Sequence, residues 1–468
     1  MLINSDNLPD SPSRPGSSSR PLRVLFLVVQ FAPLNVAGAY RPTKFVKYLA
    51  NHGHQPIVVT LPPTQSAELF NKPLDADRFK DFPTQVPIYE VPIDDLKQVQ
   101  NNRWRDFFAV IDNIGRAWAP ALERQLTEII AKEKPDCLLV SAPPFSIATL
   151  GRQLASKYQL PYLLDLRDAW SQWCVAPYRS YWHYQKLLQE ERACLKAAAT
   201  TIATTPQTAK ALDELHFTAT QKKVNVIPNG YERKMEWPKV IKVPSFAERD
   251  KLVIGYVGSF YYSPAARANM LRPWYKKPPY KALQYVPHKE DWLYRSPYFF
   301  FKALRALLDE EPAYAKKLRI EFVGHHHDWL EEMLQEFDLK SIFKSHGFVS
   351  NQRALEIQSN FDLFLGTSAK IHGKADYSMG SKYYEYIRFG QPILGFTPNG
   401  VLKDFLEESG MGIIANPDNL TEAKSILKKA IEGGFELHPN AKYLDSFHLD
   451  AIAAQLVHTI QRMIGVSA

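Results

Sequence analysis

Ser381, Lys382 and Glu385 open a predicted short helix that ends at Gly390. Serine is a favourable N-cap residue, and glycine adopts the left-handed conformation at which helices often end. Lys382 and Glu385 are three residues apart and therefore share a helix face. A cation beside a helix N-terminus stabilises a diphosphate, and a carboxylate one turn further on accepts the two hydroxyls of a ribose. The alternative is a surface ladder with Arg388, in which each pair contributes about 0.2–0.5 kcal/mol.

The elements around this helix are predicted to form a βαβ unit. Residues 361–366 form a buried strand, a loop with Gly373 and Gly380 follows, and residues 392–396 form the next strand. Parallel strands joined by a helix bind ligands where the loop leaves the first strand and enters the helix. The sequence therefore places the phosphate-binding residues at the ligand edge of a sheet.

The N-terminal half opens with a unit of the same kind. Residues 22–29 form an apolar run without alternation, which is typical of a strand buried on both faces of a parallel sheet. A loop with Gly38 follows, and a helix is predicted behind Pro42, over residues 43–50. Gly-x-Gly-x-x-Gly is absent, so a dinucleotide cofactor is not expected. Arg41 is either a solvated arginine at the helix start or a phosphate contact, and its place at a sheet edge favours the contact.

Arg167 and Asp168 follow another predicted strand, residues 161–166, at its carboxyl end. Such a pair forms a structural salt bridge, or it orients the hydroxyl group of an acceptor at the ligand edge of the sheet. The sequence leaves both interpretations open.

The second half of the chain opens in the same way. Residues 252–257 form a strand that leads into Gly258 and Ser259, which are expected at the ligand edge. A helix restarts after Arg295, and residues 261–294, rich in Lys, Arg and aromatic residues, are interpreted as an insertion. This segment is either a lid that grips a lipid head group, a glycan or a partner chain, or a loop without such a role.

Length and composition limit the class of protein. At 468 residues the chain is too long for one ordinary domain, and two α/β domains are expected. Its longest apolar run is too short to span a membrane. Three widely spaced cysteines, Cys137, Cys174 and Cys194, fit a reducing cytoplasm. The net charge of +8 favours anionic partners such as a nucleotide, a lipid phosphate or an anionic membrane surface, whereas no nucleic-acid-binding motif is present.

Other patterns indicate core packing or chance. The three histidines at 325–327 are adjacent and cannot easily converge on one metal ion, and the Asp-Ala-Asp at 75–77 stands in a polar loop without a strand before it. No metal site is therefore expected. Aromatic residues recur at helical spacing over 104–134, which favours core packing, with docking on a membrane surface as the alternative.

Four segments together resemble a GT-B glycosyltransferase, most closely one of family 4. They are Phe31 to Leu49 with Gly38 and Arg41; Ala142-Pro-Pro-Phe-Ser through Leu164-Asp-Leu-Arg-Asp-Ala-Trp170; Val226-Ile-Pro-Asn-Gly230; and Ser381-Lys-Tyr-Tyr-Glu-Tyr with Gly390-Gln-Pro-Ile. Their order and spacing carry the resemblance, which spans Arg23 to the C-terminus apart from 261–294. It implies an α/β fold of two Rossmann-like domains that face one another across a cleft.

The resemblance and the composition together give the expected domains. They are a disordered tail over 1–20, an N-terminal acceptor-binding Rossmann-like domain over 21–235, a linker over 236–250, a C-terminal nucleotide-sugar-binding Rossmann-like domain over 251–447 with the insertion 261–294, and a helix over 448–468. In this family the final helix usually crosses back to the first domain, and residues 448–464 are expected to do so.

The resemblance also assigns residues. Glu385 is similar to the ribose-binding glutamate that ends the family's Glu-x7-Glu motif, whereas the first position of that motif falls on Tyr377. Arg295 and Lys382 are similar to the pair that neutralises the donor diphosphate. Gly38 is similar to the glycine of the N-terminal loop that approaches the donor phosphate and the acceptor. Gly258, Ser259 and Ser381 complete the expected donor site.

The implied enzyme is a retaining, metal-independent glycosyltransferase without a cofactor. It moves a sugar from a nucleotide-sugar to a glycan or lipid-linked acceptor, in cell-surface polysaccharide or glycolipid synthesis. Arg167 and Asp168 are the candidates for placing the acceptor. A cytoplasmic location is expected, with peripheral contact to the cytoplasmic face of the membrane and no nucleic-acid partner. Tyr377 and the insertion keep two alternatives open: a non-catalytic nucleotide-sugar-binding scaffold subunit and an epimerase of the same fold.

Overall fold

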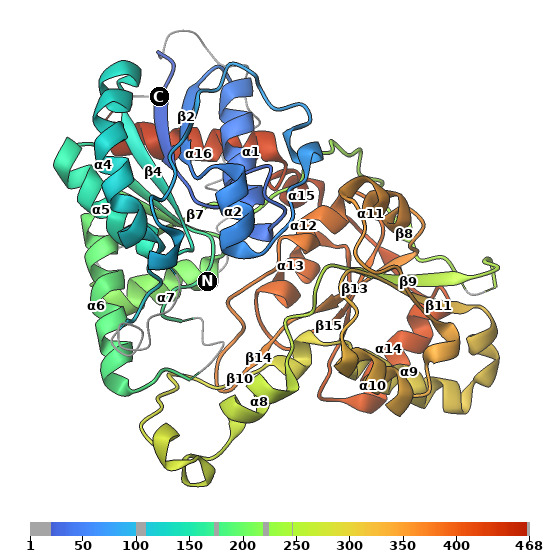
Figure 1. The fold of residues 1–468 in the computed structure, drawn as a ribbon. Helices are drawn as coiled ribbons and strands as arrows, with labels where there is room; N and C mark the ends of the chain where they lie inside the picture. Colours follow the sequence, from blue (N-terminus) through green and yellow to red (C-terminus); the bar gives the residue numbers. More distant parts are fainter. Residues whose placement is uncertain (1–19, 100–108, 173–176, 219–223, 246, 466–468) are drawn as a thin grey trace.

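The computed structural model describes residues 20–99, 109–172, 177–218, 224–245 and 247–465. The predicted tail up to residue 19, and residues 104–108 of the aromatic stretch, lie outside them. The described chain forms two lobes, and each lobe is built on one parallel sheet (Figure 1). None of the described helices is both long and apolar enough to cross a membrane.

Seven parallel strands form the sheet of the N-terminal lobe, in the order β3-β2-β1-β4-β5-β6-β7. They are β1 (Arg23–Leu27), β2 (Gln55–Thr60), β3 (Ile88–Glu90), β4 (Cys137–Ala142), β5 (Tyr162–Leu166), β6 (Thr200–Ala203) and β7 (Val224–Val226). The four apolar residues of β1 are buried, as the unbroken apolar run predicts. The order of the first six strands is that of the Rossmann fold.

The helices of this lobe are α1 (Ala37–Asn51), α2 (Pro63–Phe70), α4 (Ile114–Glu133), α5 (Ser146–Tyr158), α6 (Tyr181–Ala197) and α7 (Pro206–His216), with 3-10 turns at Ala76–Phe79 and Leu96–Gln98. The prediction that the first helix starts behind Pro42 is wrong, because α1 begins at Ala37 and contains Pro42. A proline this close to the helix start leaves only the carbonyl four residues earlier, that of Gly38, without its helical N–H. Gly38 and Arg41 therefore lie on a helix and not in a loop.

Six parallel strands form the sheet of the C-terminal lobe, in the order β12-β11-β9-β13-β15-β16. They are β9 (Leu252–Val257), β11 (Leu318–Val323), β12 (Phe343–Ser345), β13 (Leu363–Thr367), β15 (Ile393–Phe396) and β16 (Gly412–Ala415). Counted within the lobe, this is again the 3-2-1-4-5-6 order of the Rossmann fold. Both lobes therefore place the carboxyl ends of their strands at a ligand edge.

Helices cover both faces of the second sheet. They are α9 (Tyr298–Glu310), α10 (Asp328–Glu336), α11 (Asn351–Gln358), α12 (Lys382–Ile387), α13 (Val401–Ser409) and α14 (Leu420–Ile431). The expected linker contributes a short strand, β8 (Ile241–Lys242), which pairs antiparallel with β17 (Glu436–Leu437).

The last helices run from the second lobe to the first. α15 (Ala441–Asp445) leads into α16 (Leu449–Ile464), which packs against α1 (Figure 1). Leu449, Ile452, Leu456 and Ile460 of α16 share a buried cluster with Phe45 of α1. Apolar burial of this kind holds α16 on the N-terminal lobe.

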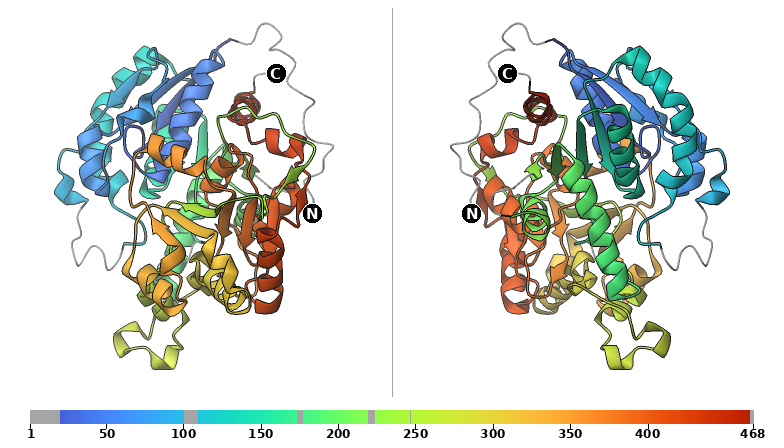
Figure 2. Two further views of the ribbon diagram at one scale, coloured as in Figure 1. Left: turned by 90° about the vertical axis from the view of Figure 1, so that its right-hand side faces the viewer. Right: turned by 90° about the vertical axis from the view of Figure 1, so that its left-hand side faces the viewer.

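The residues interpreted as an insertion form a projection from the C-terminal lobe. It contains α8 (Pro264–Leu271), 3-10 turns at Trp274–Lys276, Pro279–Lys281 and Trp292–Arg295, and β10 (Glu290–Asp291). At its base, β10 pairs antiparallel with β14 (Lys370–Ile371). Figure 2 shows that its tip extends beyond both lobes, away from the sheets.

Candidate active site

Lys382 and Gly258 meet at the ligand edge of the C-terminal sheet. Gly258 directly follows β9 and has a φ of +106°, which favours glycine. A Cβ atom at this position would lie 3.7 Å from Lys382 Nζ. The ammonium donates a hydrogen bond to the Tyr256 hydroxyl and lies 4.0 Å from the centre of that ring. Burial, together with the neighbouring Arg295 cation, lowers the pKa of Lys382 to about 7.

Arg295 is the second cation at this edge. It ends the 3-10 turn after β10, its guanidinium lies 4.9 Å from the centre of the Trp292 ring, and Nη2 donates to Ser378 Oγ. The nearest carboxylate oxygen, Asp376 Oδ2, is 4.0 Å away. Burial lowers the pKa of Arg295, but Asp376 and Glu290 raise it by more. Arg295 Nε is buried and has no hydrogen-bond partner among the described residues.

Ser381 does not cap the helix, which corrects the sequence prediction. Its backbone is already helical, with φ −58° and ψ −24°, and its side chain makes no cap hydrogen bond. The helix it precedes, α12, has six residues. Because a macrodipole grows with the number of aligned peptide units, the positive charge here comes mainly from Lys382.

Glu385 lies on α12 where the two lobes meet. Its Oε2 accepts a hydrogen bond of 3.0 Å from Arg388 Nη1, and its Oε1 accepts one from the Tyr40 hydroxyl. Tyr40 belongs to α1 of the opposite lobe. The predicted ribose-binding carboxylate therefore already binds a hydroxyl group in the described structure.

Arg167 and Gly38 lie together at the ligand edge of the N-terminal sheet. Arg167 Nη2 donates to Gln30 Oε1 at 3.0 Å and to the Pro143 carbonyl. A Cβ atom on Gly38 would lie 2.6 Å from Arg167 Nη1 and 1.8 Å from Gln30 Oε1, so any other residue would displace the ends of these two side chains. Burial lowers the pKa of Arg167 to about 10, although Asp168 and Asp165 favour its charge.

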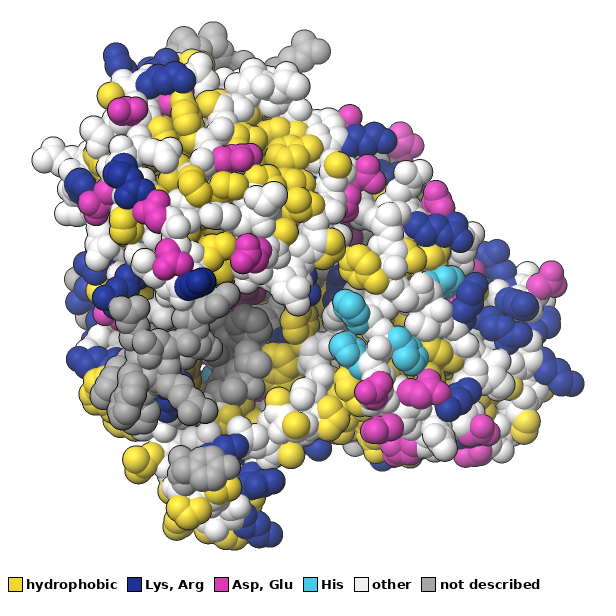
Figure 3. Space-filling view, viewed as in Figure 1, with side chains coloured by type: hydrophobic (Ala, Val, Ile, Leu, Met, Phe, Trp, Pro, Cys, Tyr) yellow, Lys and Arg dark blue, Asp and Glu magenta, His cyan; other side chains and the backbone are white. Residues whose placement is uncertain are grey.

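Asp168 faces the opposite lobe. Its side chain is exposed, yet surrounding protein displaces enough water to raise the pKa of its carboxyl, an effect that Arg167 and Arg295 oppose. The charge of Arg295 acts on the Asp168 carboxyl, so the two side chains lie close to one another. Because Arg295 belongs to the C-terminal lobe, this interaction runs between the lobes. Figure 3 shows that the surface is hollowed where the lobes face one another.

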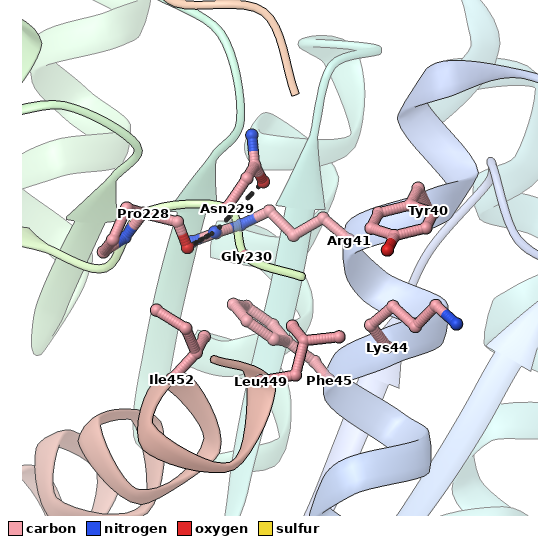
Figure 4. Close-up of a pocket in the computed structure, with 9 residues that line it drawn as sticks. All are labelled: Tyr40, Arg41, Lys44, Phe45, Pro228, Asn229, Gly230, Leu449 and Ile452. Atoms are coloured by element: carbon pink, nitrogen blue, oxygen red, sulfur yellow. Dashed lines mark hydrogen bonds between the residues drawn. The ribbon is translucent and has the colours of Figure 1, made fainter. Parts of the chain in front are cut away.

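Arg41 is buried, so it is not a solvated arginine at the helix start, whereas its phosphate contact stays a prediction. Its Nε donates to Asp165 Oδ1 at 2.9 Å, and the two side chains are 4% and 0% exposed. Nη1 donates to the Pro228 carbonyl at 2.8 Å and to Asn229 Oδ1 at 3.4 Å, across a small pocket closed by α16 (Figure 4). The positive charge of Arg41 is therefore bound within the N-terminal lobe, where it links α1 to the Ile-Pro-Asn-Gly turn at 227–230.

Tyr377 forms a junction between the lobes that the sequence did not reveal. Its carbonyl accepts hydrogen bonds from Thr205 Oγ1 at 2.6 Å and Thr208 Oγ1 at 3.1 Å. Its hydroxyl lies 2.7 Å from the Gln172 carbonyl and 2.6 Å from Glu290 Oε1. Glu290 comes from the insertion, so a buried carboxylate lies next to the residue at the first position of the Glu-x7-Glu motif.

Of the predicted site residues, Gly258, Arg295 and Lys382 lie together at the edge of the C-terminal sheet, and Asp168 lies across from them. Arg41 lies apart from this group, within the N-terminal lobe. Ser259 directly follows Gly258 and is exposed. Within the part of the chain that the structure describes, no group of three or more His, Cys, Asp or Glu side chains is arranged to hold a metal ion. The contacts Tyr40–Glu385, Tyr377–Gln172 and Tyr377–Glu290 had no sequence signal, because they join residues 87 or more positions apart.

Comparison with known proteins agrees with this architecture. Residues 38–230 match the glycosyl transferase 4-like domain. No curated protein matches the sequence significantly. A sucrose-phosphate synthase from Thermosynechococcus elongatus is 14% identical, with a TM-score of 0.60 over 95% of this chain and 100% of its own. A glycosyltransferase from Rickettsia africae is 14% identical, with a TM-score of 0.53 over 96% and 100% of the two chains.

A third solved structure, the lipopolysaccharide outer core galactosyltransferase WaaB, is 11% identical, with a TM-score of 0.55 over 94% of this chain and 99% of its own. At such identities the structures show the fold, and the matched domain adds the family of the N-terminal part. The predicted resemblance is confirmed: the chain has the GT-B fold of two Rossmann-like domains facing across a cleft, carries a glycosyl transferase 4-like domain over residues 38–230, and is a transferase enzyme of the glycosyltransferase class.

Proposed function

We propose that the chain is a retaining, metal-independent glycosyltransferase that moves a sugar from a nucleotide-sugar to a glycan or lipid-linked acceptor. The proposed setting is the cytoplasmic synthesis of cell-surface polysaccharide or glycolipid. The observation that carries the proposal is the pair of cations, Arg295 and Lys382, at the ligand edge of the C-terminal sheet. The buried free thiols of Cys137 and Cys194 agree with a reducing compartment.

Among the described residues, Lys382 has no carboxylate partner, and Arg295 is only loosely paired with one. Lys382 forms no ion pair with a described carboxylate, and the carboxylate nearest to Arg295 is at the 4.0 Å limit of one. Arg295 lowers the pKa of Lys382, so the two partly buried cations repel one another, and an anion bound between them would offset this cost. A nucleoside diphosphate supplies that anion, and its charge grows as the sugar leaves.

Glu385 is placed for the ribose of the same donor. It lies one turn beyond Lys382 on α12, and the hydroxyl of Tyr40 occupies one of its oxygens. A ribose hydroxyl is the same kind of hydrogen-bond donor, so it can replace the tyrosine hydroxyl without leaving the carboxylate unpaired.

In the proposed reaction the bond between the anomeric carbon and the diphosphate oxygen breaks as the acceptor oxygen bonds to that carbon from the same face. The acceptor proton passes to the departing phosphate, so no side-chain nucleophile is required. Arg295 and Lys382 stabilise the charge that develops on the diphosphate. Asp168, across from Arg295, is proposed to orient the acceptor hydroxyl, with Arg167 beside it.

Calorimetric titration with UDP-, GDP- and ADP-sugars tests the donor site, and turnover assays with the sugar that binds test the activity. Glu385→Ala should abolish transfer or raise the donor KM steeply without lowering the melting temperature. The exposed Glu407→Ala on α13 is the matched control. Full activity and an unchanged KM in Glu385→Ala would contradict the ribose assignment.

The same assays separate the two alternatives. Tight binding of a nucleotide-sugar without turnover on any acceptor would favour a scaffold subunit. An isomerised nucleotide-sugar formed without an acceptor would identify an epimerase. For an active transferase, NMR of the product reports whether the anomeric configuration is retained, and an assay with excess chelator reports whether a metal is needed.

A further inference from the structure

The projection formed by the insertion carries one sign of charge. Residues 261–289 contain six Lys and Arg residues and no Asp or Glu. The first of these cations, Arg267, forms a two-fold hydrogen-bonded ion pair with Asp291 at the base of the projection, at 2.6 and 2.7 Å. Arg272, Lys276 and Lys289 form no ion pair with any described carboxylate. The outer part of the projection is therefore an uncompensated basic surface.

Its cations crowd one another. Burial lowers the pKa of Lys277, and the neighbouring charges of Lys281 and Lys289 lower it further. Lys277 Nζ is also bound to Gln284 Oε1 at 3.4 Å, so the lysines are held on one small unit. An anionic surface placed against this unit would relieve the repulsion.

Large apolar side chains are exposed among these charges. Trp274, Tyr275 and Leu283 are 76%, 68% and 79% exposed, more than any other large apolar side chain that the structure describes. Figure 3 shows apolar and basic side chains together on the projection, and no acidic ones there on that face. Soluble proteins rarely expose such residues side by side unless the surface binds something.

The N-terminal lobe continues this surface. Tyr178 and Tyr285 exchange backbone hydrogen bonds of 2.9 and 3.0 Å, which joins the projection to the segment before α6. The Tyr285 ring packs against Tyr181, with centroids 4.9 Å apart. Tyr181 and Trp182 at the start of α6 are themselves 56% and 48% exposed. Aromatic side chains from both lobes therefore lie on the same part of the molecule.

We propose that this basic aromatic surface, defined as Trp274, Tyr275, Lys276, Leu283, Lys289 and the adjoining Tyr181 and Trp182, docks on a bilayer that contains anionic phospholipids. Tryptophan and tyrosine are enriched at membrane–water interfaces, and lysines are attracted to anionic head groups. The projection extends beyond both lobes (Figure 2), and its most exposed large apolar side chain is the aliphatic Leu283, on which no nucleobase would stack. An aliphatic tip among lysines fits the boundary between head groups and acyl chains.

This proposal goes beyond the proposed function, since it requires neither a donor nor an acceptor. It has one consequence that rests on that function. Tyr261, the first residue of the insertion, lies near enough to Asp168 and Arg295 for both charges to act on the pKa of its hydroxyl. The membrane-bound segment thus begins at the site where a lipid-linked acceptor would enter.

Vesicle flotation with the full-length chain tests the docking. Phosphatidylcholine vesicles with and without phosphatidylglycerol are the probes, and the wild type should float with the anionic vesicles only. Trp274→Ala/Leu283→Ala and Lys276→Gln/Lys289→Gln should each lower the partition coefficient more than tenfold, since one lysine near an anionic surface contributes about fivefold. Phe348→Ala/Lys344→Gln, an exposed pair elsewhere on the C-terminal lobe, is the matched control and should bind like the wild type.

Several results would overturn the proposal. They are equal flotation of all variants, equal flotation with neutral vesicles, no flotation of the folded wild type, and binding of single-stranded RNA through these residues in place of vesicles. Circular dichroism checks that the variants fold. Calorimetry with nucleotide-sugars keeps the two proposals apart: a wild type that floats but binds no nucleotide-sugar refutes the donor site alone, and one that binds donor but does not float refutes the docking alone.

Discussion

Lys382 is expected to take up a proton when a nucleoside diphosphate binds beside it. In the described structure, burial and the Arg295 cation lower its pKa from 10.5 to about 7. Negative charge next to the amine favours the ammonium form and moves the pKa back toward its ordinary value. Raising the pH from 6 to 8 should therefore weaken donor binding, because the free protein loses this proton while the complex keeps it.

The size of the effect follows from the pKa of about 7. At pH 6 about ten in eleven Lys382 side chains are protonated, and at pH 8 about one in eleven. If the amine is fully protonated in the complex, binding takes up about 0.1 proton at pH 6 and about 0.9 proton at pH 8. The association constant should then fall about tenfold between these pH values. The diphosphate diester of a nucleotide-sugar does not titrate in this range.

Calorimetry in two buffers of different ionisation enthalpy measures the proton uptake directly. Lys382→Arg is the control, because an arginine keeps its charge at both pH values and should bind donor with little proton uptake. An uptake near zero at pH 8 in the wild type, or the same uptake in Lys382→Arg, would refute the reasoning.

The free energy of unfolding should change with pH in the opposite direction from that expected for a lysine with a carboxylate partner. Since the folded pKa of Lys382 is below the unfolded one, the unfolded chain binds more protons between about pH 7 and pH 10.5. The destabilising contribution of Lys382 is therefore fully present below pH 7 and is relieved as the pH rises through this window. Lys382→Met should raise the melting temperature near pH 6 while it abolishes donor binding.

Three further outcomes are expected. Tyr40→Phe should increase donor affinity severalfold in calorimetry, because a ribose no longer competes with a tyrosine hydroxyl for Glu385; unchanged affinity would contradict this. Gly38→Ala should lower turnover and leave the melting temperature within a few degrees, because its Cβ displaces the guanidinium of Arg167; wild-type turnover would contradict this. Arg41→Met should lower the free energy of unfolding in urea by about 3–5 kcal/mol, because it leaves a buried carboxylate unpaired; a loss below about 1 kcal/mol would argue against a structural role.

Both sheets could be predicted from the sequence because their strands carry a local signal. Residues buried on both faces of a parallel sheet form unbroken apolar runs, as in β1 and β9, and the short length of these runs favours a strand over a buried helix. The carboxyl edge of each sheet then follows from chain direction alone. Strand pattern and chain direction therefore predict Gly258 and Arg167 at ligand edges without information on tertiary contacts.

Roles that depend on burial could not be predicted in the same way. Arg41 stands at the expected edge, but its partner Asp165 is the one charged residue of the apolar strand β5, and the sequence does not show which side chain pairs with it. The start of α1 is mispredicted for a related reason. Proline is favoured in the first turn of a helix and costly further in, so Pro42 indicates a helix start, and no local signal shows that α1 begins at Ala37 and accommodates Pro42 in its second turn. Residue type and position indicate which side chains could bind a ligand, whereas tertiary packing determines which of them are buried in structural contacts.

The contacts between the lobes explain why the site can be both closed and responsive to ligand. The large apolar clusters lie within one lobe, under α16, or around Tyr231 where the chain crosses between the lobes, and the cluster that joins the lobes at the site contains only Ala169, Ile371 and Tyr377. The other contacts here are hydrogen bonds, such as those of Tyr40 and Tyr377, and each contributes about 1 kcal/mol. Contacts between a diphosphate and the cations Arg295 and Lys382 are charge-assisted, and each is stronger than one of these hydrogen bonds. Opening the lobes at the site therefore breaks few contacts. A donor held by Arg295 and Lys382 shifts the equilibrium between open and closed arrangements to the extent that it binds one of them more tightly.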